Sequence, residues 1–183
     1  FMGGLGLGNF VFGRRADRVP RPLAFYGVLE LGISLSAAAS PWLIDGIRTI
    51  YSGVGGQTAL GLSGATLLRL GLSCLVILLP TMLMGGTLPA AVRAVTDPRD
   101  TYRRGMALLY GSNTLGAVAG AVLSTFILLE ALGTRRTLVA AALVNLVLGL
   151  VAFVKGRRAA RVGATAMSPA DEPSKLPPPE RPE

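Results

Sequence analysis

Residues 66–95 read TLLRLGLSCLVILLPTMLMGGTLPAAVRAV, and this stretch decides what kind of protein the chain forms. Its central part, residues 70–88, holds no charged side chain over a length that can cross about 30 Å of hydrocarbon. Pro80 and Pro89 interrupt it, and prolines kink helices in a way that the neighbouring helices of a membrane bundle accommodate. The stretch therefore predicts a kinked transmembrane helix.

Apolar stretches of the same kind recur on both sides of this one. They predict a partial span over residues 1–13 and full spans over 23–44, 66–95, 106–132 and 134–154. Residues 1–13 are too short to cross a bilayer, so we expect them to be the end of a longer span. Residues 45–65 are rich in Gly, Ser and Thr and predict a loop at the membrane surface.

The predicted fold class is therefore all-α, a polytopic transmembrane helix bundle over residues 1–156. Residues 157–183 are basic at first and then rich in proline, and they cannot bury a core. We interpret them as a disordered tail or linker.

The composition agrees with a lipid environment and excludes several kinds of chemistry. Of the 183 residues, 51% are hydrophobic and 15% are charged, whereas soluble domains carry about 25% charged residues. The chain has no histidine and a single cysteine, Cys74, which excludes histidine-based zinc sites, Ser-His-Asp catalysis and an internal disulfide. We therefore predict no catalytic site, metal site or cofactor within this chain.

The distribution of positive charge predicts the orientation. The net charge is +8, from 18 Lys and Arg against 10 Asp and Glu. Three clusters of basic residues follow alternate spans, and the intervening segments carry fewer. The clusters are Arg14, Arg15, Arg18 and Arg21, then Arg93, Arg99, Arg103 and Arg104, then Lys155, Arg157, Arg158 and Arg161, against Arg48, Arg69, Arg135 and Arg136 elsewhere. The clusters and the C-terminal tail are expected in the cytoplasm, and because topology explains them we expect no nucleic acid partner.

Small residues spaced four apart predict close helix packing. Gly4 and Gly8 have this spacing, and so do Gly116 and Gly120. Such pairs let two helix backbones approach in lipid. Two interpretations stay open, namely general packing within one bundle and a specific seam in a homo-oligomer.

Polar groups inside the predicted spans are the candidates for function. Glu30 lies eight residues into its span, where an ionised carboxylate is costly unless it faces the bundle interior or is paired. It is either a proton or substrate-cation site or a structural hydrogen-bonding group. Tyr110 and Asn113 belong to a polar patch with Ser112 and Thr114, and they either bind substrate or join helices by hydrogen bonds.

Three motifs carry a resemblance to a known family. Gly13, Asp17, Arg18 and Arg21 match the cytoplasmic loop G-x-x-x-D-[RK]-x-G-[RK]-[RK] of major facilitator superfamily (MFS) transporters, from which Pro20 and Pro22 depart. Residues 79–89 (LPTMLMGGTLP) and 109–117 (LYGSNTLGA) resemble the LP-x-x-LMG-x-TLP and LY-x-x-NT-x-GA signatures of bacterial fused MFS/spermidine synthase-like proteins. The resemblance covers nearly all of residues 1–156.

The resemblance implies an MFS-like half in a bacterial cytoplasmic membrane, holding the equivalents of helices two to six. It implies a fused C-terminal aminopropyltransferase-like domain as partner, which this chain would anchor while it transports a polyamine or a related small molecule. The chemistry of that spermidine synthase-like enzyme belongs to the partner domain, so no catalytic residue is carried over. The alternatives are a fragment of an independent MFS-type transporter and a purely structural membrane anchor.

Overall fold

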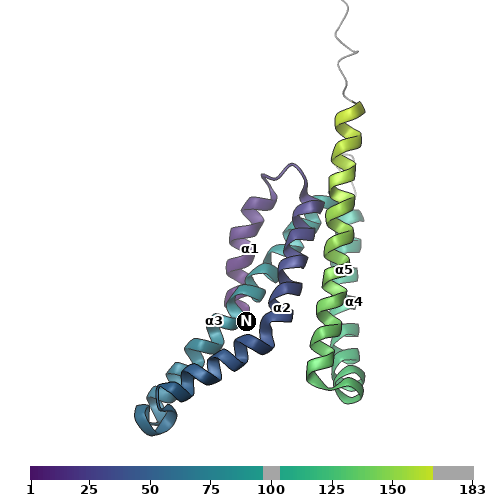
Figure 1. Ribbon diagram of the computed structural model, residues 1–183. Helices are drawn as coiled ribbons and strands as arrows, with labels where there is room; N and C mark the ends of the chain where they lie inside the picture. Colours follow the sequence, from purple (N-terminus) through teal and green to yellow (C-terminus); the bar gives the residue numbers. More distant parts are fainter. Residues whose placement is uncertain (97–103, 167–183) are drawn as a thin grey trace, which may run out of the picture.

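The computed structural model describes residues 1–96 and 104–166, and every regular element within these ranges is a helix (Figure 1). The predicted all-α class is therefore confirmed for the described residues. In chain order the elements are α1 (Met2–Ala16), α2 (Pro22–Gly53), α3 (Gly56–Val95), α4 (Arg104–Leu123), the π-helical turn η1 (Ser124–Leu128) and α5 (Leu129–Ala166).

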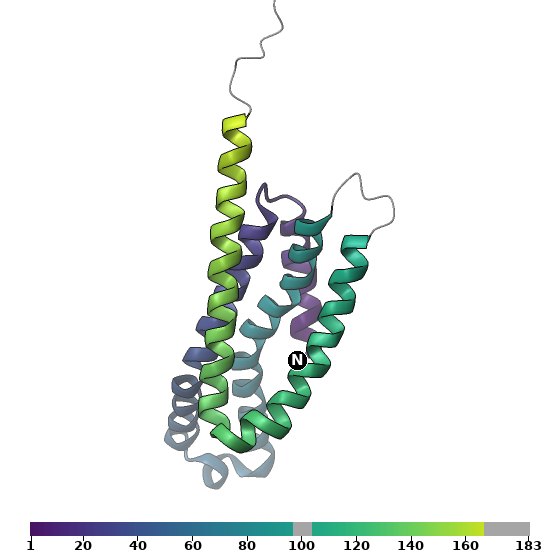
Figure 2. The ribbon, with the colours of Figure 1, turned by 90° about the vertical axis from the view of Figure 1, so that its right-hand side faces the viewer.

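The helices run alternately up and down, and α1, α2, α3 and α5 form the body of the molecule. α1 packs on α3, α3 packs on α2, and α2 packs on α5, so these four lie side by side (Figure 1). α4 makes only a slight contact with α3, and from the side it stands apart from α5 except near η1 (Figure 2). α4 is therefore the least packed of the long helices.

Three helical stretches are long and apolar enough to cross a membrane: Pro22–Gly53, Gly56–Val95 and Arg104–Ala159. The third reverses direction at Gly133, whose φ of 73° and ψ of 167° are not helical. A positive φ is strained for residues with a side chain, so glycine suits this position. The two arms, residues 104–132 and 134–159, each exceed the roughly 20 residues that a spanning helix needs. This one stretch thus contains two of the predicted spans, 106–132 and 134–154.

The predicted loop over residues 45–65 is wrong, because α2 continues to Gly53 and α3 begins at Gly56. The chain leaves α2 at Val54 and Gly55, where Gly55 takes a left-handed φ of 84°. A second break follows within α3 at Gly61, whose φ of 65° and ψ of 178° are not helical. The polar side chains of this segment stay within the helices by donating to carbonyls of their own turns. Thr49 donates to Asp45 at 3.0 Å and Thr58 to Gly55 at 2.7 Å, and just beyond the segment Thr66 donates to Leu62 at 2.8 Å.

Glycines bring α1 and α3 into close parallel contact, as predicted for Gly4 and Gly8. A Cβ on Gly4 would overlap the hydroxyl of Thr81, and a Cβ on Gly8 would overlap the backbone carbonyl of Met82. From the other side, a Cβ on Gly85 would overlap the carbonyl oxygen of Leu5. The two backbones can meet only because these positions carry no side chain.

The antiparallel helices α2 and α5 also approach closely at glycine positions, and a hydrogen bond joins them. A Cβ on Gly27 would lie 2.6 Å from the backbone nitrogen of Phe153, and a Cβ on Gly149 would lie 3.0 Å from the carbonyl oxygen of Gly27. Further along, the Ser34 hydroxyl donates to the carbonyl oxygen of Ala142 at 2.8 Å. Interhelical hydrogen bonds of this kind hold helices together in lipid.

Large apolar side chains point outward, which is the reverse of a soluble fold. Leu108, Leu115 and Leu143 are 74%, 73% and 54% exposed. Among the described residues no large side chain is fully buried, and the small core consists of Ala16, Leu29 and Ala90. An apolar surface of this extent suits contact with lipid tails.

The basic clusters gather at one end of the bundle. α1, α3 and α5 run toward that end, and α2 and α4 start from it (Figures 1 and 2). Arg14 and Arg15 lie in the last turn of α1, Arg93 lies in the last turn of α3, and Arg104 begins α4. Arg99 and Arg103 lie outside the described residues. The side of a membrane that this end faces stays a prediction.

Candidate functional site

A groove of about 1130 Å³ opens between α1, α3 and α4, and we name it the α1–α3–α4 groove. α4 contributes Tyr110, Asn113 and Ala117 to its wall. The facing walls come from the first half of α1 and the second half of α3, with Asp17 at the end of α1. Their lining residues are Phe1, Met2, Leu5, Gly6, Asn9 and Asp17, and Met84, Gly85, Thr87, Leu88, Pro89, Val92, Arg93 and Thr96.

The three motif segments, distant in sequence, meet in this groove. Asp17 comes from the loop motif, and residues 84–89 supply most of the α3 wall. Tyr110, Asn113 and Ala117 come from the third motif. Residues singled out by sequence pattern alone therefore share one surface.

The helix geometry of α4 explains why Tyr110 and Asn113 face the groove while their polar neighbours do not. Residues three apart lie on the same face of an α-helix. Ser112 donates its hydroxyl to the carbonyl oxygen of Leu109, and Thr114 donates to that of Tyr110, both at 3.0 Å. The Tyr110 phenol and the Asn113 amide are therefore the polar groups that this segment presents to the groove.

The groove is apolar along most of its wall and has polar groups at two levels. Asn9, Tyr110 and Asn113 supply amide and phenol groups that both donate and accept hydrogen bonds. Asp17 and Arg93 place a carboxylate and a guanidinium toward the basic end of the bundle. This arrangement can bind a small polar solute. Among the described residues no group of three His, Cys, Asp or Glu could hold a metal ion.

Glu30 lies apart from this groove. It sits on the packed side of α2, is 8% exposed, and does not line the groove where Tyr110 and Asn113 lie. Tyr26, one turn earlier on the same helix, lies beside the Glu30 carboxylate. The structure therefore does not bring the three predicted substrate residues together, and a transport role for Glu30 stays a prediction.

The loop motif forms the turn between α1 and α2. Gly13 lies in the last turn of α1, Asp17 is the C-cap of that helix, and Arg21 is the N-cap of α2. The amides of Asp17 and Arg18 donate to the carbonyl oxygens of Gly13 and Arg15, at 3.2 and 3.1 Å. These bonds tie the loop to the end of α1.

Gly116 and Gly120 have no neighbour that would explain their spacing. A Cβ on either glycine would meet no atom of the described chain within 4 Å. Their packing role and the homo-oligomer that it implies therefore stay predictions.

Sequence reasoning missed two polar residues that the structure brings into play. Tyr26 lies beside Glu30, and the spacing of four residues between them was the available signal of contact on one helix face. Asn9 lines the groove, and its position as a single amide in an apolar stretch was the available signal.

Comparison with known proteins found no matching family, no similar curated protein and no similar solved structure.

Proposed function

We propose that this chain is the membrane part of a fused MFS/spermidine synthase-like protein, and that its α1–α3–α4 groove admits a polyamine or a related small cation. The chain would lie in a bacterial cytoplasmic membrane as an MFS-like half, with its basic end in the cytoplasm. A fused C-terminal aminopropyltransferase-like domain would be its partner. The observation that carries the proposal is the convergence of all three motif segments on one groove.

The chemistry of the groove supports a flexible, cationic solute. A polyamine offers several N–H donors separated by short apolar chains. The groove offers acceptors at Asn9, Tyr110, Asn113 and Asp17, separated by apolar wall. Asp17 supplies negative charge, which Arg93 in the same groove offsets in part. Hydrogen bonds rather than net charge would therefore carry most of the recognition.

The shape of α5 supports the anchoring role. This helix runs from Leu129 to Ala166 and projects beyond the ends of the other helices on the basic side (Figure 1). Gly156 still packs on Ala24 in the first turn of α2, so Lys155, Arg157 and Arg158 lie where α5 leaves the bundle, and there they would contact headgroups or water. On this proposal α5 and the Pro-rich segment after it would connect the bundle to the attached domain.

Uptake of labelled spermidine into vesicles that contain the chain tests the proposal. Asn113→Leu keeps the approximate volume and removes the amide, and we expect uptake to fall about tenfold because hydrogen bonds to the solute are lost. Thr114→Val is the matched control, because the Thr114 hydroxyl bonds its own helix and lies outside the groove. Uptake by this control should stay within about twofold of wild type.

A second variant separates Glu30 from the groove. Glu30→Gln should leave the flux unchanged if the groove alone forms the route, and a loss of flux would return Glu30 to the mechanism. Absence of saturable spermidine uptake by the wild-type chain, or equal losses in Asn113→Leu and Thr114→Val, would contradict the proposal.

A purely structural anchor is the second candidate, and one observation favours it. Among the described residues the most buried acid, Glu30, lies beside Tyr26 of its own helix and does not line the α1–α3–α4 groove. On this alternative Glu30 stabilises α2, and apolar substitutions at Asn113 leave the rate of an attached enzyme unchanged.

A further inference from the structure

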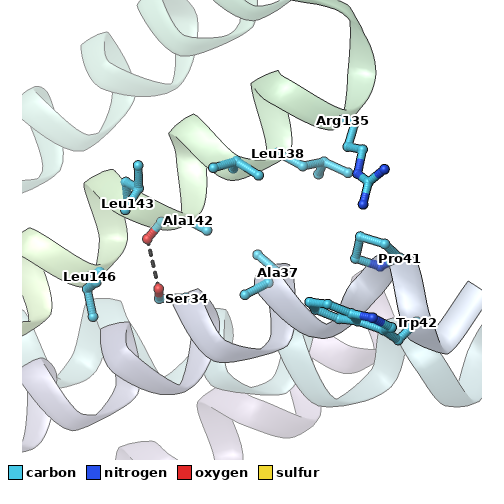
Figure 3. Close-up of a pocket in the computed structure, with 11 residues that line it drawn as sticks. Ser34, Ala37, Pro41, Trp42, Arg135, Leu138, Ala142, Leu143 and Leu146 are labelled. Atoms are coloured by element: carbon cyan, nitrogen blue, oxygen red, sulfur yellow. Dashed lines mark hydrogen bonds between the residues drawn. The ribbon is translucent and has the colours of Figure 1, made fainter.

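A second groove lies between α2 and α5, and Figure 3 shows the residues that line it. It has a volume of about 250 Å³, and we name it the α2–α5 groove. Ala37 and Ala38 form its α2 wall, and Leu138 and Leu146 stand opposite on α5. The Ser34–Ala142 hydrogen bond of 2.8 Å lies at its inner end. The groove is thus an apolar slot whose inner polar groups are already paired.

The outer end of this slot is aromatic and cationic. Trp42, Pro41 and Arg135 lie together there, with the Arg135 guanidinium directed toward α2 (Figure 3). Trp42 is 71% exposed, although its indole is a large apolar group with one N–H donor. Trp42 lies near the end of the apolar part of α2, shortly before Asp45 and Arg48, and tryptophan at such a position typically lies at the level of the lipid headgroups.

An adjoining hollow of about 270 Å³ extends the slot toward the α2–α3 turn. It shares Pro41, Arg135 and Leu138 with the slot and adds Asp45, Arg48 and Thr134. Asp45 and Arg48 are 4.0 Å apart and largely offset each other's charge. For Arg135 no ion pair is recorded among the described residues, so the mouth of the slot keeps an excess positive charge.

We propose that the α2–α5 groove binds an anionic phospholipid. One acyl chain lies in the slot against Ala37 and Leu138, and the phosphate meets the Arg135 guanidinium beside Trp42. A guanidinium binds phosphate oxygens in a two-pronged geometry, which a neutral side chain cannot replace. The excess positive charge at the mouth favours a headgroup with net negative charge over a zwitterionic one.

The single tryptophan of the chain provides a direct test. Bromine on a lipid chain quenches indole fluorescence on contact, so brominated phosphatidylglycerol and brominated phosphatidylcholine report occupancy beside Trp42. The 183-residue chain is reconstituted with each lipid at equal mole fraction. We expect phosphatidylglycerol to be favoured about fivefold over phosphatidylcholine.

Two variants locate the headgroup and the chain separately. Arg135→Gln should reduce the preference for phosphatidylglycerol to about one, whereas Arg136→Gln should keep it, because Arg136 does not line the slot. Ala37→Phe fills the slot and should reduce quenching by both lipids. Circular dichroism of each variant checks that the helices remain.

Equal quenching by the two lipids in the wild type would overturn the proposal. So would equal losses of preference in Arg135→Gln and Arg136→Gln, since the effect would then be one of general surface charge. This inference does not depend on polyamine uptake, because no helix lines both grooves: the first lies between α1, α3 and α4, and the second between α2 and α5.

Discussion

In α2 the hydroxyl group of Ser40 replaces a backbone hydrogen bond that Pro41 cannot make. Pro41 lies inside this helix and has no N–H to donate to the carbonyl oxygen of Ala37. The Ser40 hydroxyl donates to that oxygen instead, at 2.7 Å. In lipid an unpaired carbonyl has no water to bond, so this contact lets the helix pass through a proline.

The first prediction concerns this pair of residues. Ser40→Ala should lower the free energy of unfolding in detergent by about 1 kcal/mol, because the Ala37 carbonyl is left without a donor. Ser36→Ala is the control: its hydroxyl donates to the Gly32 carbonyl oxygen at 2.8 Å, and no proline removes the backbone donor of that carbonyl. Thermal unfolding followed by circular dichroism checks the difference. Equal destabilisation of both variants would show that Ser40 does not compensate for Pro41.

At the scale of elements, glycines rather than large apolar side chains decide which helices meet. The contacts of α1 with α3 and of α2 with α5 are both made at glycine positions. Hydrophobicity cannot select partners in lipid, whereas close backbone contact can. The exposed leucines of α4 fit this view, since α4 packs least on its neighbours.

The second prediction tests this dependence within α1. Gly8→Ala should destabilise the chain by about 1–3 kcal/mol, because the new methyl group would overlap the Met82 carbonyl. Gly6→Ala, in the same helix, meets nothing within 4 Å and should be neutral or stabilising, because alanine favours a helix by up to about 1 kcal/mol. Unfolding in detergent measures both. Similar effects of the two substitutions would refute the α1–α3 contact.

The sequence was informative about helices and weak about their partners. Length and lack of charge predicted helical spans, and the spacing of Gly4 and Gly8 predicted a close contact. Gly116 and Gly120 have the same spacing but no described neighbour. The spacing of two glycines therefore does not tell which helix, if any, packs against them. Residues 45–65 were misinterpreted because Thr49 and Thr58 bond within helical turns, where composition alone suggests a loop.

For the candidate site too, the sequence indicated which residues are polar but not which of them lie together. Tyr110 and Asn113 could be predicted from polarity in an apolar stretch, and the structure places them on one groove. Glu30 met the same criterion and lies elsewhere, since polarity does not tell which side of a helix packs on its neighbour. Only the arrangement of helices separates the two cases.

At the scale of the whole molecule, the account depends on a bundle whose two ends differ in charge. The basic clusters lie at the end formed by the loop after α1 and the projecting part of α5. Arg48 and Arg135 lie in the opposite half, near the second groove. A membrane-spanning chain of this kind should place Val19 and Ala159 on one side of the bilayer and Gly46 on the other.

Labelling of introduced cysteines with a membrane-impermeant maleimide tests this claim most directly. In a background with Cys74→Ser, single variants Val19→Cys, Ala159→Cys and Gly46→Cys are expressed in cells and prepared as right-side-out vesicles. The account predicts that Gly46→Cys reacts in intact vesicles, whereas Val19→Cys and Ala159→Cys react only after permeabilisation. Reaction of all three in intact vesicles, or recovery of the chain in the soluble fraction without detergent, would contradict it.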